Sequence, residues 1–231
     1  MSGRVIAIVP AAGAGRRMNA DRPKQYLPLL DETVIEHSLR QLAAVPEVER
    51  IVVALDPDDN YWADLPLSLS KPLQTVAGGL ERVHSVYNAA AAVIDELDDD
   101  DWLLVHDAAR PCVRVGEIQQ LLVKLQDHPC GGLLAMKVVD TMKQQTEAGE
   151  VQQTVNRELL WHALTPQVFR AKTLFRALRE GIDNNRPITD ESSAVEALGM
   201  APLLVEGSRD NLKITRPEDL ALAEFYLSNR Y

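Results

Sequence analysis

The sequence is poor in cysteine, in aromatic residues and in long hydrophobic runs. Its 231 residues include two cysteines and 5% aromatic residues. Cys112 and Cys130 fit no metal-ligand spacing, so we expect two small buried thiols in a reducing compartment rather than a disulfide. The apolar runs are strand-sized, well short of the roughly 20 residues of a membrane-spanning helix. Because Met1–Arg4 leads directly into the first apolar run and leaves no room for a signal peptide, we expect a cytoplasmic protein.

Positive charge is also scarce. Lys and Arg number 24 against 34 Asp and Glu, which gives a formal net charge of −10. A nucleic-acid-binding surface needs an excess of cations, so the composition argues against a nucleic-acid partner. Phosphate chemistry would require the cations to gather at one site, and candidates for such a group are Arg16, Arg17, Lys24, Arg82, Arg110, Arg157 and Lys213. With 46% hydrophobic and 25% charged residues, the chain is typical of a globular protein, and its length suits one α/β domain over residues 1–231.

Two common nucleotide-binding motifs are missing. A dinucleotide fingerprint would need a glycine where Met18 stands, and no glycine is followed by Lys-Ser or Lys-Thr at P-loop spacing. The chain has instead a short apolar strand, Val5–Val9, that ends at Pro10 and is followed by small residues. Small side chains let backbone N–H groups approach a ligand closely, and the cations that follow suit a polyphosphate. The alternative is a tight turn whose arginines are merely solvated.

The rest of the chain alternates strands and helices. We expect strands at Val5–Val9, Ile51–Leu55, Leu73–Ala77, Trp102–His106, Gly131–Val139 and Pro202–Val205, and helices at about 33–44, 85–97, 115–126, 171–180, 189–199 and after Pro217. This spacing predicts an α/β fold with a mainly parallel, Rossmann-like sheet and helices on both faces. Ligands bind at the carboxyl ends of such strands, where three loops meet: Pro10–Arg17, Gly78–Ser85 and Asp107–Pro111.

The stretch from about residue 138 to 157 interrupts the α/β alternation. Val138–Lys143 and Val151–Val155 flank the turn signal Glu147–Glu150, which predicts a projecting β-hairpin arm. Because its side chains are mostly polar, this hairpin has little hydrophobic core of its own. It is therefore either an exposed hairpin or an arm that packs on a second subunit. After it we expect a short helix, Glu158–Ala163, and a turn at Thr165–Gln167.

Two charged residues stand out near expected strand and helix ends. Asp107 follows a hydrophobic strand, where a carboxylate needs a cation or a hydroxyl, so it suggests a metal or substrate role. The alternative is a structural pair with Arg110. Lys213 alternates with apolar neighbours just before the last helix and points either into the site or into solvent. Capping boxes at 33–36 and 215–218 predict the starts of two helices.

Seven motifs, in order along nearly the whole chain, carry a family resemblance: PAAGAGRRM with PKQY, HDAARP, TVNR, LTPQ, TDE and DNLKITRPEDLALAE. Together they resemble the 2-C-methyl-D-erythritol 4-phosphate cytidylyltransferase family of the non-mevalonate isoprenoid pathway. The resemblance implies a nucleotidyltransferase sheet, a homodimer formed through the β-arm, and Mg²⁺ or another divalent cation carried with CTP. The implied reaction joins CTP and 2-C-methyl-D-erythritol 4-phosphate into 4-diphosphocytidyl-2-C-methyl-D-erythritol and releases pyrophosphate.

The resemblance also implies roles for individual residues. The CTP-binding residues would be Pro10, Ala11, Ala12, Gly13, Gly15, Gly79 and Ser85. The catalytic residues would be Arg17, Lys24, Lys213 and Asp107, and the substrate would contact Asp107, Ala108, Arg110, Thr141, Arg157, Thr165 and Lys213. Thr141 and Arg157, on the arm, would reach into the partner subunit's site. Asp107 and Asp210 are the candidate metal ligands.

One residue departs from the family pattern. Leu80 stands where an acidic residue is expected after two glycines, so cytosine selectivity could be weaker here. Three other functions compete with the implied one. A cytidylyltransferase for another polyol phosphate, such as ribitol 5-phosphate, would differ around Thr141, Arg157 and Lys213. A non-catalytic nucleotide sensor would not need to keep Arg17, Lys24, Asp107 and Lys213 together, and a dehydrogenase would need the missing fingerprint.

Overall fold

A mainly parallel sheet forms the centre of the molecule in this computed structural model, which describes residues 3–13 and 21–229. Within these residues the largest sheet has seven strands in the order β11-β7-β10-β6-β1-β4-β5. The strands are β1 (Val5–Pro10), β4 (Val48–Leu55), β5 (Leu73–Ala77), β6 (Trp102–Val105), β7 (Gly131–Lys137), β10 (Trp161–Arg170) and β11 (Leu203–Glu206). Strand β10 pairs antiparallel with β6 and β7, and the other described pairs of this sheet are parallel. The predicted fold class is confirmed.

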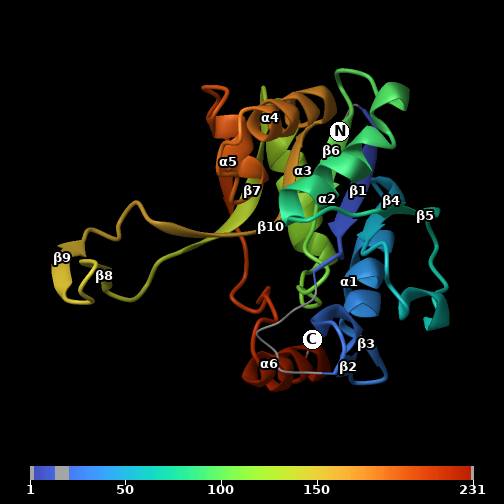
Figure 1. Cartoon of the computed structure of the whole chain (residues 1–231), viewed down its shortest axis with the longest axis horizontal. Coiled ribbons are helices and arrows are strands. Elements are labelled where there is room, and N and C mark those ends of the chain that lie inside the picture. Colours follow the sequence, from blue (N-terminus) through green and yellow to red (C-terminus); the bar gives the residue numbers. More distant parts are fainter. Residues whose placement is uncertain (1–2, 14–20, 230–231) are drawn as a thin grey trace.

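Helices cover both faces of this sheet because the side chains of each strand alternate between the faces. On β1, Val5, Ala7 and Val9 pack in one core with α1 (Val34–Ala43) and α3 (Val115–Leu125). Ile6 and Ile8 pack in a second core on the opposite face. The helices of that face are α2 (Arg82–Ala91), α4 (Ala171–Asp183) and α5 (Glu191–Glu196). Figure 1 shows the two layers on either side of the strands.

A third, smaller group of elements lies below the carboxyl ends of the strands (Figure 1). It comprises α6 (Pro217–Ser228), the short strands β2 (Pro28–Leu29) and β3 (Glu32–Thr33), and the 3-10 turn η2 (Lys24–Tyr26). Its own apolar cluster joins Leu29 and Val34 to Ala109, Ile214 and Ala223. This cluster therefore fastens α6 and the segment before it to the end of the sheet where ligands are expected.

Both predicted capping boxes start helices, with one shift. Glu36 Oε2 accepts from the Thr33 N–H at 2.8 Å at the start of α1, as expected. At the start of α6 the capping carboxylate is Asp219 instead of Glu218. Its Oδ2 accepts from the N–H groups of Thr215 and Arg216, both at 2.8 Å. The residue three positions after the N-cap Arg216 is Asp219, which explains the shift.

The predicted hairpin arm is present and projects away from the body of the molecule (Figure 1). It consists of β8 (Met142–Gln145) and β9 (Val151–Val155), paired antiparallel. Gly149, in the turn between them, has φ of +82°, a conformation that L residues with a side chain rarely adopt. The side chains of both strands are largely exposed, so the arm has no apolar core within this chain.

Three local predictions were wrong. Residues 161–170, where part of a short helix and a turn were expected, form the single strand β10. Pro166 is tolerated there because it sits at a register irregularity between Ala163 and Gln167, where no regular ladder bond is required. Helix α2 ends at Ala91 rather than near Leu97. The acidic Asp95 and Glu96 that follow would oppose the dipole at a helix C-terminus.

The two cysteines lie inside the protein as buried thiols, as predicted. Cys130 belongs to the core beneath α2 and α4, and Cys112 to the cluster around α6. Across residues 3–13 and 21–229, no helix combines the length and apolar character that crossing a bilayer requires.

Candidate active site

The three loops expected at the carboxyl ends of the strands meet around one cavity of about 340 Å³. This volume lies in the range of small-molecule sites. Of the residues predicted from the sequence, the lining includes Pro10, Ala11, Ala12, Gly13, Lys24, Gly79, Ser85, Asp107, Ala108 and Lys213. Residues from five separate segments of the chain therefore converge as the motifs predicted. Gly15 and Arg17, and Arg16 between them, lie outside the described residues.

The conformation of the first loop is stabilised by Gln25, a residue to which the sequence assigned no role. Gln25 Nε2 donates to the carbonyl oxygens of Ala11 at 2.7 Å and Gly13 at 3.2 Å. Because their carbonyls are bonded to Gln25, these residues keep a fixed loop conformation. Across the cavity, Gly78 allows the second loop to come close. A Cβ on Gly78 would lie only 2.5 Å from Ala12 Cβ.

The second loop is fixed by Ser85, in the first turn of α2. Its Oγ accepts from the Gly79 N–H at 3.1 Å. The Leu80 side chain, between these residues, is fully exposed at 100% and lies on the cavity rim. The backbone of this turn is thus ordered by Ser85, while the residue that departs from the family pattern makes no packing contribution.

Asp107 is the centre of a charged cluster on the cavity wall. Arg82 Nε donates to Asp107 Oδ1 at 2.9 Å. Lys213 Nζ lies 2.8 Å from Oδ2, and Arg110 Nε lies 3.5 Å from the same oxygen. Arg82 also forms a two-pronged pair with Glu191, at 2.6 Å and 3.0 Å. The cluster holds three cations and two carboxylates, so it carries net positive charge toward the cavity.

The charges in this cluster shift the pKa values of its members. Burial alone would raise the pKa of Asp107, but Arg82, Lys213 and Arg110 outweigh it and hold that pKa well below its usual range. Burial likewise opposes the charge on Arg82, yet Glu191 and Asp107 raise the pKa of Arg82 above its usual value. Burial lowers the pKa of Arg110. Asp107 therefore stays ionised at neutral pH and serves as a fixed acceptor rather than a proton carrier.

A buried chain of hydrogen bonds holds the backbone of Asp107. The Asp107 N–H donates to Thr165 Oγ1 at 3.1 Å, and the Thr165 hydroxyl lies 3.0 Å from His106 Nδ1. His106 Nε2 lies 3.0 Å from the Arg110 carbonyl. A carbonyl only accepts, so Nε2 carries the proton and Nδ1 accepts from Thr165. Burial lowers the pKa of His106 to about 4, which keeps the ring neutral.

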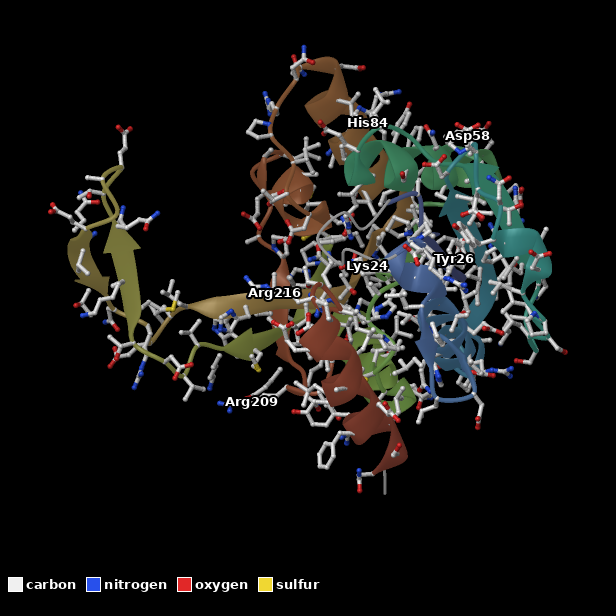
Figure 2. All side chains as sticks on the ribbon, turned by 60° about the horizontal axis from the view of Figure 1, so that its bottom comes forward. Lys24, Tyr26, Asp58, His84, Arg209 and Arg216 are labelled. Atoms are coloured by element: carbon white, nitrogen blue, oxygen red, sulfur yellow. The ribbon has the colours of Figure 1, made fainter. Side chains whose placement is uncertain are left out.

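Lys24 and Lys213 approach the cavity from the side of α6. Lys24 Nζ donates to the Ile214 carbonyl at 2.7 Å, beside the segment that carries Lys213. Figure 2 shows Lys24 in the middle of the molecule, with Arg216 near it at the start of α6. The segment is anchored by Asn211, whose Nδ2 donates to the Thr165 carbonyl at 2.8 Å. Both lysines line the cavity, and Lys213 contacts Asp107 there.

Two predicted residues have surroundings that differ from those expected, and two others lie on the arm, where they were expected. Arg110 is buried behind Asp107, where its Nη1 donates to the Asn211 carbonyl at 2.7 Å, and it is absent from the cavity lining. The hydroxyl of Thr165 is used inside the protein instead of facing a substrate. Thr141 and Arg157 lie on the arm, exposed and outside this chain's cavity. Arg157 donates there to the Val139 carbonyl.

The two candidate metal ligands do not come together. Asp107 faces three cations, whereas Asp210 pairs with Arg114, whose Nε donates to its Oδ2 at 2.9 Å. Asp210 does not line the cavity. Among the residues that the structure describes, no group of three or more His, Cys, Asp or Glu side chains could hold a metal ion. Metal ligation by Asp107 and Asp210 stays a prediction that this geometry does not favour.

Two residues of the site, Glu191 and Gln25, were not predicted from the sequence. A third, Arg82, was predicted only as a member of the group of cations. Glu191 lies in the TDE motif, and Gln25 lies in PKQY, but neither was assigned a role. No local signal singled out Glu191, because carboxylates are common in the first turn of a helix, where they face the positive end of the helix dipole.

A mainly parallel sheet with small-residue loops and fixed cations at its carboxyl edge defines a nucleotide-binding α/β protein of the nucleotidyltransferase class. The sequence profile of 2-C-methyl-D-erythritol 4-phosphate cytidylyltransferase (IspD) matches residues 5–229. The chain belongs to this family. The predicted family and the predicted enzyme class, a cytidylyltransferase, are confirmed.

Similar proteins and structures agree with this assignment. The chain is 53% identical over 224 residues to the 2-C-methyl-D-erythritol 4-phosphate cytidylyltransferase of Vibrio cholerae serotype O1, covering 97% of this chain and 96% of that protein. Its counterpart from Vibrio atlanticus is 50% identical, with coverage of 97% and 95%. The crystal structure of the Francisella tularensis enzyme of the same name superimposes with a TM-score of 0.84 at 38% identity, covering 97% of this chain and 100% of that one.

Proposed function

We propose that the cavity transfers a cytidylyl group from CTP to 2-C-methyl-D-erythritol 4-phosphate, by in-line attack of the substrate phosphate on the α-phosphorus. The products are 4-diphosphocytidyl-2-C-methyl-D-erythritol and pyrophosphate. The observation that carries this proposal is the convergence of the small-residue loop, Lys24, Asp107 and Lys213 on one cavity in a member of this family. The substrate is named by the family, and the cavity supports it through its charge and size.

The reaction calls for charge neutralisation rather than a general base. A phosphate monoester has a second pKa near 6, so the attacking group is mostly dianionic at neutral pH. An anion must then approach an anionic α-phosphate. Positioned cations stabilise the charge of such a transition state. Lys24 and Lys213 supply this charge in the described part of the cavity, and Arg17 is the further cation expected from the motif.

The nucleotide half of the site lies on the first two loops. The triphosphate would rest against the backbone N–H groups of Ala12 and Gly13, where small residues leave room for it. The Ala11 N–H already donates to the Ala54 carbonyl at 2.8 Å, so Ala11 would contribute only its small side chain to this wall. The base would be read by the turn at Gly79 and by Ser85. Support comes from the Ser85 hydrogen bond to Gly79 N–H, which keeps that turn in one conformation.

The polyol-phosphate half lies on the charged cluster. The Asp107 carboxylate, ionised and facing the cavity, would accept hydrogen bonds from the methylerythritol hydroxyls. Lys213, with its side chain 38% exposed, would bind the phosphate. Arg110 and Thr165 would act behind Asp107, by holding its side chain and backbone in place.

A divalent cation, Mg²⁺ or an equivalent, would enter with CTP, bound by the phosphates. The described residues do not fit a resident metal site, because Asp107 is already paired with cations and Asp210 with Arg114. The chemistry that such a cation supplies is neutralisation of the triphosphate charge. The protein contribution rests on Lys24 and Lys213 on the cavity wall.

The arm, residues 138–157, would join two copies of the chain into a homodimer and carry Thr141 and Arg157 to the partner subunit's cavity. This agrees with the exposure of both arm strands and with exposed Val139 and Val151 on the arm. Residues 1–231 would form one nucleotidyltransferase domain, working in the cytoplasm on soluble phosphorylated substrates, without nucleic acid or membrane partners.

The test is pyrophosphate release with Mg²⁺ and 2-C-methyl-D-erythritol 4-phosphate, comparing CTP with UTP, ATP and GTP. We expect rapid release with CTP and little with the other nucleotides. Release with several triphosphates would support the proposed reaction but show weak selectivity for the base, which would be attributed to Leu80. No release with this substrate, followed by release with ribitol 5-phosphate, would overturn the proposed substrate. Tight CTP binding without turnover on either polyol would indicate a nucleotide sensor.

A further inference from the structure

Glu191 is a buried carboxylate that the proposed reaction leaves without a task. It is 1% exposed and does not line the cavity, and both of its oxygens accept from the Arg82 guanidinium, at 2.6 Å and 3.0 Å. Stability alone is a weak explanation. The desolvation of a buried ion pair largely cancels its attraction, and apolar side chains of similar volume are often as stable. The pair therefore points to a geometric role.

Glu191 is held rigidly from the sheet side. Gln167, on β10, donates from Nε2 to Asp190 Oδ2 at 2.9 Å and accepts at Oε1 from the Ser192 N–H at 2.8 Å. These hydrogen bonds fix the positions of Asp190 and Ser192, the residues on either side of Glu191. Asp190 also caps α5 by accepting from the Ser193 N–H at 2.9 Å. The position of the Glu191 backbone is thus fixed relative to the sheet rather than to the surface.

From Glu191 the contacts continue to the cavity wall. Arg82 uses Nη1 and Nη2 for Glu191 and Nε for Asp107 Oδ1, at 2.9 Å. The planar guanidinium has a fixed fork geometry, so binding one carboxylate at its end sets the direction of Nε. Asp107 Oδ2 is left for Lys213, at 2.8 Å, and for Arg110, at 3.5 Å. One rigid chain of contacts therefore runs from α5 through α2 to the cavity carboxylate.

We infer that Glu191 is a positioning residue for the transfer reaction: it holds Arg82 so that Asp107 presents one fixed carboxylate orientation to the polyol phosphate. This rests on the proposed function. Without the Glu191 charge, Arg82 turns toward Asp107 alone and pulls on both of its oxygens. That competes with Lys213 for Oδ2, and it changes the polyol-phosphate half of the site while leaving the nucleotide loops unchanged.

The test is the Glu191→Gln variant, assayed by steady-state kinetics in each substrate. We expect kcat/KM for the polyol phosphate to fall about 10- to 100-fold, the scale of a small misplacement of a reacting group. The KM for CTP should change less than about threefold. The matched control is Glu196→Gln, which removes a carboxylate from the end of the same helix, where it accepts from Ser192 Oγ, without touching Arg82. It should match the wild type.

A purely structural role would give a different result. It would lower the folded fraction and reduce kcat in the same proportion, while both KM values stay unchanged. This outcome would overturn the inference. Coupling gives a second check. Because Glu191 acts through Arg82, adding Glu191→Gln to Arg82→Lys should cost less than about threefold beyond Arg82→Lys alone. Additive losses would count against it.

Two further experiments apply if the first variant does not fold or the wild type shows no activity. If Glu191→Gln does not fold, Glu191→Asp keeps the charge but shortens the reach, and it should show the same selective loss of the polyol-phosphate kcat/KM to a smaller degree. If the wild type turns over neither polyol phosphate, the proposed function fails. The inference is then judged by the crystal structure of Glu191→Gln, where an unchanged contact between Arg82 Nε and Asp107 Oδ1 would overturn it.

Discussion

At the scale of single residues, the cavity relies on side chains whose charge is fixed by their neighbours. Asp107 is buried, yet it remains ionised because Arg82, Lys213 and Arg110 surround it and hold its pKa well below its usual range. Its folded pKa is depressed, so its contribution to stability is present above the unfolded pKa near 4 and is lost as pH falls through the lower folded value. The carboxylate therefore remains an acceptor throughout the neutral and mildly acidic range.

Lys24→Ala should lower kcat by about 10²- to 10³-fold, because a positioned donor that stabilises transition-state charge is typically worth that much. The free energy of unfolding should change by less than about 1 kcal/mol, the usual size of a single net hydrogen bond. Steady-state kinetics and urea denaturation check both values. Lys172→Ala is the matched control, since Lys172 Nζ also donates to a backbone carbonyl, that of Ile94, at 2.7 Å. An effect confined to the KM for CTP would contradict the assigned role.

Leu80→Asp tests whether the residue that departs from the family pattern reads the base. The Leu80 side chain is 100% exposed, whereas the turn itself is held by Ser85 on Gly79. We expect the ratio of kcat/KM for CTP over UTP to change less than about threefold, because an unsupported side chain loses much conformational entropy on binding. A gain of tenfold or more in this ratio would show that a carboxylate at this position contacts the base.

At the scale of elements, the arm contrasts with the rest of the fold. Strands β8 and β9 pair with each other, and their side chains are largely exposed. An isolated two-stranded hairpin is marginally stable in water. A second subunit would supply the packing that this chain does not. This exposure supports the proposal that the arm packs on a second subunit and reaches that subunit's cavity.

Mixing Arg157→Ala and Lys24→Ala subunits should restore activity if the arm acts across the dimer. Random pairing makes half of the dimers mixed, and each mixed dimer has one intact site, so about a quarter of wild-type activity should return. The control mixes Lys24→Ala with Lys213→Ala, which alter the same cavity, so every mixed site keeps one defect and no activity should return. Activity no higher than in the separate variants would place Arg157 in its own subunit's site.

At the scale of the whole molecule, pH stability should reflect one buried histidine. Burial lowers the pKa of His106 from 6.5 to about 4, so the native ring stays neutral while the unfolded ring gains a proton. The unfolded state then binds more protons between pH 6.5 and about 4, and stability falls as pH falls through this window. The full effect is roughly 3 kcal/mol.

Urea denaturation of His106→Gln should show this directly. The variant should be less stable than the wild type at pH 7, where its hydrogen bonds with Thr165 and Arg110 are altered, but its stability should fall less between pH 7 and pH 4.5. His162→Gln, which removes an exposed histidine on β10, should keep the wild-type pH dependence. If the stability of the wild type and of His106→Gln falls equally with pH, His106 is not the source of the pH dependence.

The sequence by itself determined most of the strands and helices, although not β10, together with the loops at the carboxyl ends of the strands and the arm. These features rest on local patterns: alternating apolar residues, small residues after a strand, and a turn signal between polar segments. Asp107 was identified because a carboxylate at the end of an apolar strand needs a partner. Among the residues that carry the family resemblance, Lys24, Asp107 and Lys213 likewise meet at one cavity.

Only the tertiary structure decided which charges meet. Arg82 and Glu191 are 109 residues apart, and no local pattern links them. Their contact depends on Gln167 of β10 gripping the start of α5, in a region where a turn had been predicted. The hydroxyl of Thr165 turned inward for the same reason, because β10 lies between β6 and β7 and carries this side chain beneath Asp107. Pairings between distant segments follow from how strands insert into the sheet, which short-range sequence patterns do not encode.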